Sequence, residues 1–282
     1  MPLKTPPPLN TANLLREHGL RPNKKLGQNF LQDPDILNKI ISIAGVDEND
    51  TVLEIGPGLG SLTRHLALNA KEVIAVEIDK KIIPALRASV ADYKNVRIIQ
   101  SDILEISPAE IINTPNYLVV ANIPYYITSA ILRHLLENDP RPGSMVLTIQ
   151  KEVAQRICAT QKFSLLALSV QVFGQPEIAG KIPAGAFHPA PNVDSAVIRI
   201  QLYDQPRIPA ALLDAFFKLA KAGFSQKRKT LRNSLSAGLH IPANDAENLL
   251  THAGIDPRRR AETLSLDEWG LLTKHWDERQ QR

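Results

Sequence analysis

Five short apolar segments alternate with amphipathic segments between residues 51 and 149. The apolar segments read TVLEI (51–55), EVIAVEI (72–78), VRIIQ (96–100), YLVVA (117–121) and SMVLTI (144–149). Their apolar residues are consecutive, which is typical of strands buried on both faces of a sheet. The segments between them, at 61–69, 80–90, 107–112 and 128–137, have helical spacing. This alternation predicts a doubly wound, mostly parallel sheet of the Rossmann-like α/β class.

Helical patterns flank this alternation on both sides. We expect a short helix at 11–18 and another from Pro34 to Gly45, with Asp33 as its N-cap. A helical stretch at 151–172 follows the fifth strand. The segment VDSAVIRIQL (193–202) then predicts a final strand, paired antiparallel with its neighbour.

The alternation ends at the Pro-containing segment YDQPRIP (203–209), and only helical patterns remain up to residue 276. We place a domain boundary there. The sequence thus predicts an α/β domain over 1–203 and a small all-helical C-terminal domain over 204–282. The first ten residues are rich in proline, and we expect residues 1–20 to be flexible.

Composition narrows the class of protein. With 44% hydrophobic and 22% charged residues in 282, the chain is ordinary globular material. Its single cysteine cannot form an internal disulfide, which fits a reducing compartment. It has neither a secretory signal pattern nor an apolar run near the roughly 20 residues that cross a bilayer. We expect a cytoplasmic protein that does not associate with membranes.

Basic residues gather in two places. No acidic residue lies between Asp214 and Asp245, where six basic residues fall: Lys218, Lys221, Lys227, Arg228, Lys229 and Arg232. On one continuous helix, positions 218, 221, 228 and 232 would share a face. A second cluster comprises Arg16, Arg21, Lys24 and Lys25, with Glu17 the only acid nearby. Either cluster alone is typical of a solvated face, but two without counter-charges indicate a polyanion such as nucleic acid.

The first predicted strand runs into a loop with three glycines, Gly56, Gly58 and Gly60, before a helix begins. Glycines there let the backbone turn tightly and a ligand approach it. The dinucleotide fingerprint needs a glycine at position 61, which is Ser61 here. Together with Glu54 before the loop, this spacing favours S-adenosylmethionine (SAM) over NAD as the cofactor, with a dinucleotide as the alternative.

Acidic residues follow the next two strands. Glu77 ends the second strand, where a carboxylate can accept hydrogen bonds from both ribose hydroxyls. Asp102 follows the third strand, where an acceptor can meet the adenine amino group. The alternative is that both residues are helix N-caps. Because ligands of open α/β sheets bind at the carboxyl ends of the strands, we expect the glycine loop, Glu77 and Asp102 to form one site.

The fourth strand ends in Asn122, Pro124 and Tyr125 within the stretch VVANIPYYITSAIL (119–132). A side-chain amide oxygen and a rigidly held backbone carbonyl can accept the two hydrogens of an aromatic amine, and a tyrosine can stack on its ring. This arrangement points the nitrogen lone pair at a methyl donor, so that catalysis is mostly positioning. The alternative is a helix cap with two core tyrosines.

Other chemistries have little support. The seven histidines are scattered without metal-ligand spacing, so we expect no metal. A G-x-S-x-G nucleophile elbow is absent from the sequence. His188 is interpreted as a loop residue, and Asp194 and Ser195 as a turn into the last strand.

Taken together, the motifs identify a resemblance over essentially the whole chain. The sequence resembles the small-subunit (16S) ribosomal RNA adenine N6-dimethyltransferase family (KsgA/RsmA). The stretches that carry the resemblance are KKLGQNFL (24–31), LEIGPGLGSLT (53–63), VEID (76–79), SDIL (101–104), ANIPYYIT (121–128), QKEVAQRI (150–157), FHPAPNVDSAVIRI (187–200) and FSQKRKTLRNSL (224–235). The one departure noted is Ile123, where the motif often has leucine.

The resemblance implies a function and a set of site residues. The expected fold is a Rossmann-like SAM-dependent methyltransferase sheet with a helical C-terminal domain. The expected reaction places two methyl groups on N6 of each of two adjacent adenosines near the 3′ end of 16S rRNA in the small (30S) subunit, with S-adenosylhomocysteine as product and a role in ribosome biogenesis. The implied cofactor contacts are Asn29, Leu31, Gly56, Gly58, Glu77, Asp102 and Asn122, and the implied catalytic residues are Asn122, Pro124, Tyr125 and Phe187, the last closing on the target base.

Three alternatives stay open at this point. One is an assembly factor whose binding to the small subunit matters more than methylation. Another is a large-subunit rRNA methylase of the erythromycin-resistance type, against which the match through FSQKRKTLRNSL (224–235) counts. The third is an NAD-dependent oxidoreductase. We expect a monomer, in which the helical C-terminal domain either docks RNA or caps the sheet.

Overall fold

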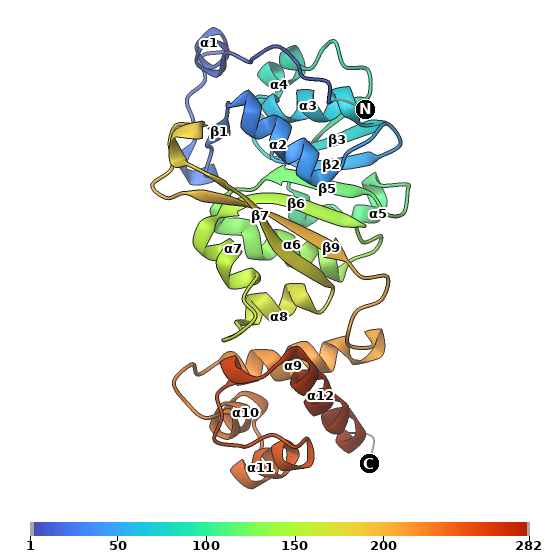
Figure 1. The fold of residues 1–282 in the computed structure, drawn as a ribbon, viewed down its shortest axis with the longest axis vertical. Coiled ribbons are helices and arrows are strands. Elements are labelled where there is room, and N and C mark those ends of the chain that lie inside the picture. Colours follow the sequence, from blue (N-terminus) through green and yellow to red (C-terminus); the bar gives the residue numbers. More distant parts are fainter. Residues whose placement is uncertain (1–2, 281–282) are drawn as a thin grey trace. The chain divides into compact units, whose positions relative to one another are not determined.

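A computed structural model describes residues 3–280 and divides the chain into two compact units (Figure 1). The α/β unit comprises the chain up to residue 154 together with 176–202. The helical unit comprises 155–175 together with the chain from residue 203 onward. The helix within 155–175 clusters with the helical unit, since it contacts the first long helix of the C-terminal region, α9 (Leu213–Phe224). A boundary at 203/204 between independently folding domains stays a prediction.

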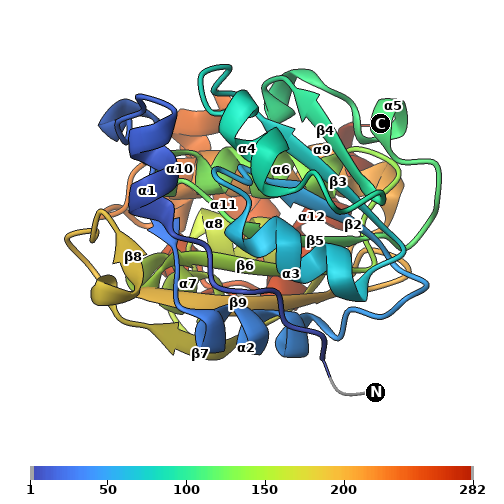
Figure 2. The same cartoon turned by 90° about the horizontal axis from the view of Figure 1, so that it is seen from above.

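The α/β unit is built on a seven-stranded sheet (Figure 2). In spatial order the strands are β4 (Val96–Gln100), β3 (Glu72–Glu77), β2 (Thr51–Ile55), β5 (Leu118–Asn122), β6 (Ser144–Gln150), β9 (Ser195–Leu202) and β7 (Gly174–Ile182). The first five are mutually parallel, and β9 runs antiparallel to β6, with Met145 opposite Ile200. The predicted α/β class and the antiparallel final strand are confirmed.

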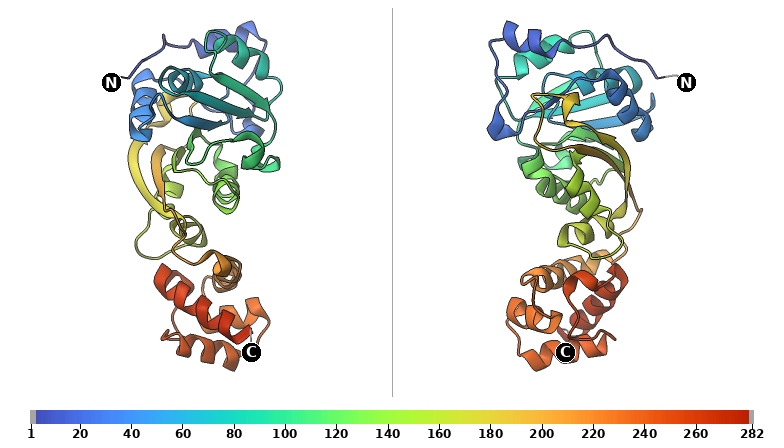
Figure 3. Two further views of the ribbon diagram at one scale, coloured as in Figure 1. Left: turned by 90° about the vertical axis from the view of Figure 1, so that its right-hand side faces the viewer. Right: turned by 60° about the vertical axis from the view of Figure 1, so that its left-hand side comes forward.

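Helices cover both faces of this sheet. They are α2 (Pro34–Ala44), α3 (Ser61–Asn69), α4 (Ile83–Ser89), the short α5 (Pro108–Ile111) and α6 (Thr128–Glu137). Figure 3 shows α2, in blue, and the green helices on opposite sides of the sheet. Asp33 caps α2 as predicted, because its side chain accepts from the amides of Asp35 and Ile36.

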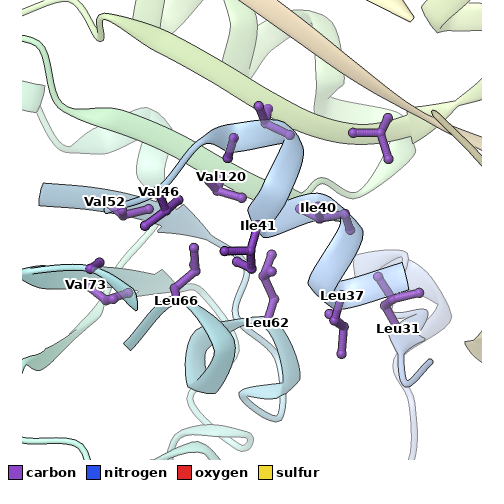
Figure 4. Close-up of a cluster of buried hydrophobic side chains, with 14 of the residues drawn as sticks. Leu31, Leu37, Ile40, Ile41, Val46, Val52, Leu62, Leu66, Val73 and Val120 are labelled. Carbon is purple, nitrogen blue, oxygen red and sulfur yellow. The ribbon is translucent and has the colours of Figure 1, made fainter. Parts of the chain in front are cut away.

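One face of the sheet carries valines at the alternate positions that point toward α2 and α3. Val52, Val73 and Val120 come from three neighbouring strands and are each fully buried. Figure 4 shows them facing the apolar side chains of the two helices: Leu37, Ile40, Ile41, Leu62 and Leu66. This core fixes the ends of β2, β3 and β5, and therefore the loops that follow those strands.

Two elements differ from the sequence-based expectation. The predicted helix at 151–172 is broken into α7 (Lys151–Ile157) and α8 (Leu165–Gln171), and Ser164 caps the second. The edge strand β7 was not predicted, since Pro176, Gly180 and mixed polarity are untypical of a strand.

The N-terminal segment belongs to the α/β unit and forms one short helix, α1 (Thr11–Glu17). Before it, Lys4 exchanges two hydrogen bonds with Asn69, and the Thr5 hydroxyl donates to Asn38 Oδ1. The predicted flexibility of residues 1–20 stays a prediction, and residues 1–2 lie outside the described part.

The helical unit contains α9 (Leu213–Phe224), α10 (Leu231–Leu239), α11 (Ala243–His252) and α12 (Leu266–Gln280). Its core is organised by Trp269, which is fully buried. Phe224 stacks on the Trp269 ring with centroids 6.0 Å apart. Gly223 lets the helix approach, because a Cβ there would lie 2.5 Å from Trp269 Cη2.

The prediction that the C-terminal basic residues share one helix face is wrong. The helix α9 ends at Phe224, and the exposed residues 227–229 lie in the turn before α10. Arg232 also has a counter-charge, because its Nε lies 2.8 Å from Glu247 Oε2 on α11. The sequence interval without acids therefore overstates the unpaired charge.

Among residues 3–280, no helix is both long enough and apolar enough to cross a membrane.

Candidate active site at the carboxyl ends of the strands

A cavity opens where β2, β3 and β5 end, and the segment 26–31 forms part of its wall. Nine of the ten predicted site residues line this cavity: Asn29, Leu31, Gly56, Gly58, Glu77, Asp102, Asn122, Pro124 and Tyr125. The tenth, Phe187, is buried in the short strand β8 (Phe187–His188) and is not part of the wall. It pairs instead with Leu31 of β1 (Phe30–Leu31), which runs antiparallel to β8.

The glycine loop after β2 requires glycine for two reasons. Gly56 and Gly58 have φ values of +67° and +58°, which L side chains rarely adopt. A Cβ on Gly58 would also lie 2.9 Å from Cε1 of Phe30. The Phe30 ring thus packs directly against the backbone of the loop.

Glu77 fastens this loop to the end of β3. Its Oε2 accepts from the Gly58 amide at 3.0 Å and its Oε1 accepts from the Asp79 amide at 2.9 Å. Burial raises the pKa of Glu77, while the bonds from Asp79 and Gly58 oppose the rise. Since each carboxylate oxygen has two lone pairs, both oxygens retain capacity for donors in the cavity, such as a vicinal diol.

Asp102 has the helix-cap role that the sequence left open as one alternative. It caps the 3-10 turn Ile103–Glu105, because its Oδ1 accepts from the Leu104 amide at 2.9 Å. Its side chain nevertheless lines the cavity, where its second oxygen can accept a further hydrogen bond.

Glu54 lies beneath the glycine loop at the floor of the cavity and is 1% exposed. Burial, reinforced by the Glu77 carboxylate, raises the pKa of Glu54 to about 8. The Thr63 hydroxyl opposes this rise, although Thr63 Oγ1 and Glu54 Oε2 do not reach hydrogen-bond geometry with any partner among the described residues. The Glu54 carboxyl is therefore largely protonated at neutral pH, and a positively charged ligand beside it would favour the ionised form.

Asn122, at the end of β5, has its amide orientation fixed by the N-terminal segment. Its Nδ2 donates to the backbone oxygen of Asn29 at 3.0 Å. The Asn29 side chain in turn donates to the Gly27 oxygen at 3.1 Å, and Gln28 Nε2 donates to Asp79 Oδ2 at 2.8 Å. Because Nδ2 is engaged, the acceptor oxygen Oδ1 is the part of the Asn122 amide left for a ligand.

Tyr125 is held by a contact with strand β9. Its hydroxyl lies 2.6 Å from Oγ of Ser195, which is fully buried at the start of β9. Burial raises the pKa of the Tyr125 hydroxyl, and the bond to Ser195 opposes the rise. Both ends of the residue are therefore restrained, since Thr128 Oγ1 donates to its backbone oxygen at 3.3 Å.

The sequence already associated Glu54 with the cofactor loop, because it is the only charged residue of its strand. It gave no individual role in the site to Gln28 or Ser195, whose partners lie 51 and 70 positions away in the chain. Within the described residues, no group of three His, Cys, Asp or Glu side chains is placed to hold a metal ion.

The lining fits a nucleoside that carries a positively charged tail. Carboxylates at the ends of β3 and β4 face the cavity, apolar side chains such as Ile78 and Ile103 lie beside them, and the orphaned Glu54 oxygen lies at the floor. A ribose diol, a flat base and a cation are the groups that such a lining can satisfy.

Comparison with known proteins agrees with this geometry. A family profile described as "Ribosomal RNA adenine dimethylase" matches residues 19–278. A protein of Dehalococcoides mccartyi named ribosomal RNA small subunit methyltransferase A is 49% identical, over 92% of this chain and 90% of its own. A protein of the same name from Enterococcus faecalis is 41% identical over 94% of each chain.

Solved structures lead to the same conclusion. A dimethyladenosine transferase from Plasmodium falciparum superposes with a TM-score of 0.76 at 26% identity, covering 89% of this chain and 98% of its own. The 23S rRNA methyltransferase ErmE superposes with a TM-score of 0.69 at 29% identity, covering 88% of this chain and 100% of its own. The chain therefore belongs to the ribosomal RNA adenine dimethylase family, whose methyltransferases use S-adenosylmethionine as methyl donor.

Proposed function

We propose that this protein dimethylates N6 of two adjacent adenosines near the 3′ end of 16S rRNA, in the small (30S) ribosomal subunit, during ribosome biogenesis. The observation that carries the proposal is the fixed amide of Asn122, which lies in the same cavity as Glu77 and Asp102. The names of the relatives at 49% and 41% identity support the small subunit as target, against 29% for the 23S enzyme.

The cofactor half of the site uses Glu77, Asp102 and the backbone of the glycine loop, with Asn29 and Leu31 closing over it. In this assignment Glu77 accepts from the ribose hydroxyls and Asp102 from the adenine amino group. SAM, when bound, supplies an electrophilic methyl group next to a positive sulfonium. Glu54 places a carboxyl beneath the loop, and a positive charge nearby would favour its ionised form.

The target half uses the turn at 122–125. Asn122 Oδ1 and a backbone carbonyl of this turn accept the two hydrogens of the adenine N6 amine, so that the nitrogen lone pair turns out of the ring plane. Tyr125 stacks on the base, in the orientation that Ser195 sets. The amine proton is lost to solvent after transfer, so the site needs positioning more than a strong base.

Phe187 is proposed as the residue that closes on the target base from the other side. It now lies buried beside Leu31, so this role requires the β1–β8 ribbon to shift when RNA binds. We further propose that the basic turn 227–229 of the helical unit docks RNA phosphates, and that the enzyme acts as a monomer in the cytoplasm.

The test uses purified protein, labelled SAM and small subunits that lack adenine methylation, with large-subunit RNA in parallel. We expect N6,N6-dimethyladenosine at two adjacent positions of 16S rRNA by mass spectrometry. Asn122→Ala should abolish the label even at saturating SAM, and Asn138→Ala, an asparagine outside the cavity, should retain it. Label on large-subunit RNA alone would refute the proposed target.

A further inference from the structure

Tyr126 is exposed at the mouth of the cavity. It follows Tyr125 in the 3-10 turn Tyr125–Ile127, and both residues line the cavity. Unlike Tyr125, the side chain of Tyr126 is 60% exposed, the largest exposed fraction among the big hydrophobic side chains of the described residues. A single exposed apolar side chain is ordinary on a protein surface, so the feature that distinguishes Tyr126 is its position in the lining of the cavity.

The two neighbouring tyrosines are anchored in different ways. Successive side chains in a 3-10 turn point about 120° apart, so the rings face different surroundings. Tyr125 reaches inward to Ser195, whereas Tyr126 lies against Gly27 of the N-terminal segment. A Cβ on Gly27 would lie 3.5 Å from both Cδ1 and Cε1 of Tyr126. The ring is thus supported on one side by backbone and is open to solvent elsewhere.

The proposed RNA substrate would present a second unstacked base close to Tyr126. An enzyme that acts on a base takes that base out of the stack, which strips its neighbour of one stacking partner. Exposed aromatic rings bind unstacked bases of single-stranded RNA without regard to sequence. A ring one residue away from the target-stacking tyrosine is within reach of the next nucleotide.

We propose that Tyr126 is a nucleobase-binding site, which stacks the nucleotide adjacent to the adenosine under methylation. The inference rests on the proposed function, because it needs an RNA substrate with an extruded adenosine. In this arrangement Tyr125 stacks on the adenine under methylation and Tyr126 stacks on the adjacent base. Dimethylation of two adjacent adenosines then needs only a one-nucleotide exchange between the two rings.

A purely structural role is the competing explanation. If Tyr126 served only to brace the segment at Gly27, its loss would loosen Asn29 and Leu31, and SAM binding would weaken. A stacking role instead raises KM for RNA and leaves the SAM affinity unchanged. The two explanations therefore separate by which ligand is affected.

The experiment compares Tyr126→Ala, Tyr126→Phe and the wild type on unmethylated small subunits. We expect Tyr126→Ala to raise KM for the subunit by roughly 5- to 150-fold, the range expected for loss of one base–aromatic stack, with SAM Kd unchanged. Tyr126→Phe retains the ring and should behave as wild type. Ile178→Ala, which removes another exposed apolar side chain outside the cavity, is the matched control.

Each outcome is decisive. An unchanged KM in Tyr126→Ala, or an equal loss in Tyr126→Phe, would overturn the stacking site, as would a weakened SAM affinity that accounts for the whole effect. The proposed function fails separately, if wild-type protein places no dimethyladenosine on 16S rRNA. The wild-type reaction alone therefore distinguishes failure of the proposed function from failure of the stacking site.

Discussion

The buried carboxyl of Glu54 should make folding of the α/β unit depend on pH. In the unfolded chain its pKa has the ordinary value of 4.5, and in the folded protein burial raises the pKa to about 8. Between these values the folded state holds a proton that the unfolded state has lost, so stability falls as pH rises through this window. The slope approaches about 1.4 kcal/mol per pH unit.

Glu54→Gln keeps the shape and removes the titration. Between pH 5.5 and 7.5 the wild type should lose roughly 2–3 kcal/mol relative to the variant, as an upper bound. For a chain of this size that corresponds to a relative fall in Tm of about 5–10 °C. Thermal unfolding of both proteins at pH 5.5, 6.5, 7.5 and 8.5 measures it, with Glu48→Gln as an exposed-carboxylate control. Parallel curves for wild type and Glu54→Gln would refute the reasoning.

Three further predictions concern packing and positioning. Ser195→Ala and Tyr125→Phe each remove the same hydrogen bond, so each should lower kcat about 2- to 10-fold with SAM Kd unchanged. The double variant should lose no more activity than either single variant, and additive losses in single-turnover assays would contradict this. Gly58→Ala combines a positive φ with a contact of 2.9 Å, and we expect a cost of about 1–3 kcal/mol in unfolding and weak SAM binding by calorimetry. Gly223→Ala should destabilise the helical unit by about 1–3 kcal/mol through the contact with Trp269, seen in denaturant unfolding, and leave SAM Kd as in wild type.

Elements with a strong local pattern were predictable from the sequence. Strand β2 has the predicted bounds 51–55, and α2 begins after Asp33 as its cap predicts. Here the residues that decide the structure are neighbours in the chain. Strand β7 was missed because an edge strand buries little, so that Pro176 and charged residues are tolerated in it.

The site was predictable to the extent that strand ends converge. The α/β pattern brings the glycine loop, Glu77 and Asp102 to one edge of the sheet, and the structure places them in one cavity. The contacts that orient the side chains were not predictable. The bonds from Asn122 to Asn29 and from Tyr125 to Ser195 span 93 and 70 residues, and no local pattern encodes them.

The pairing of β1 with β8 has a consequence for synthesis of the chain on the ribosome. Leu31 emerges early, but its partner Phe187 follows 156 positions later. The segment at 26–31 therefore lacks this anchor until nearly the whole α/β unit has been translated. Asp79 and Asn122 will already have emerged by then, so the segment can first be held through Gln28 and Asn29. Its pairing with β8, which completes this wall of the cofactor cavity, forms only after Phe187 has been translated.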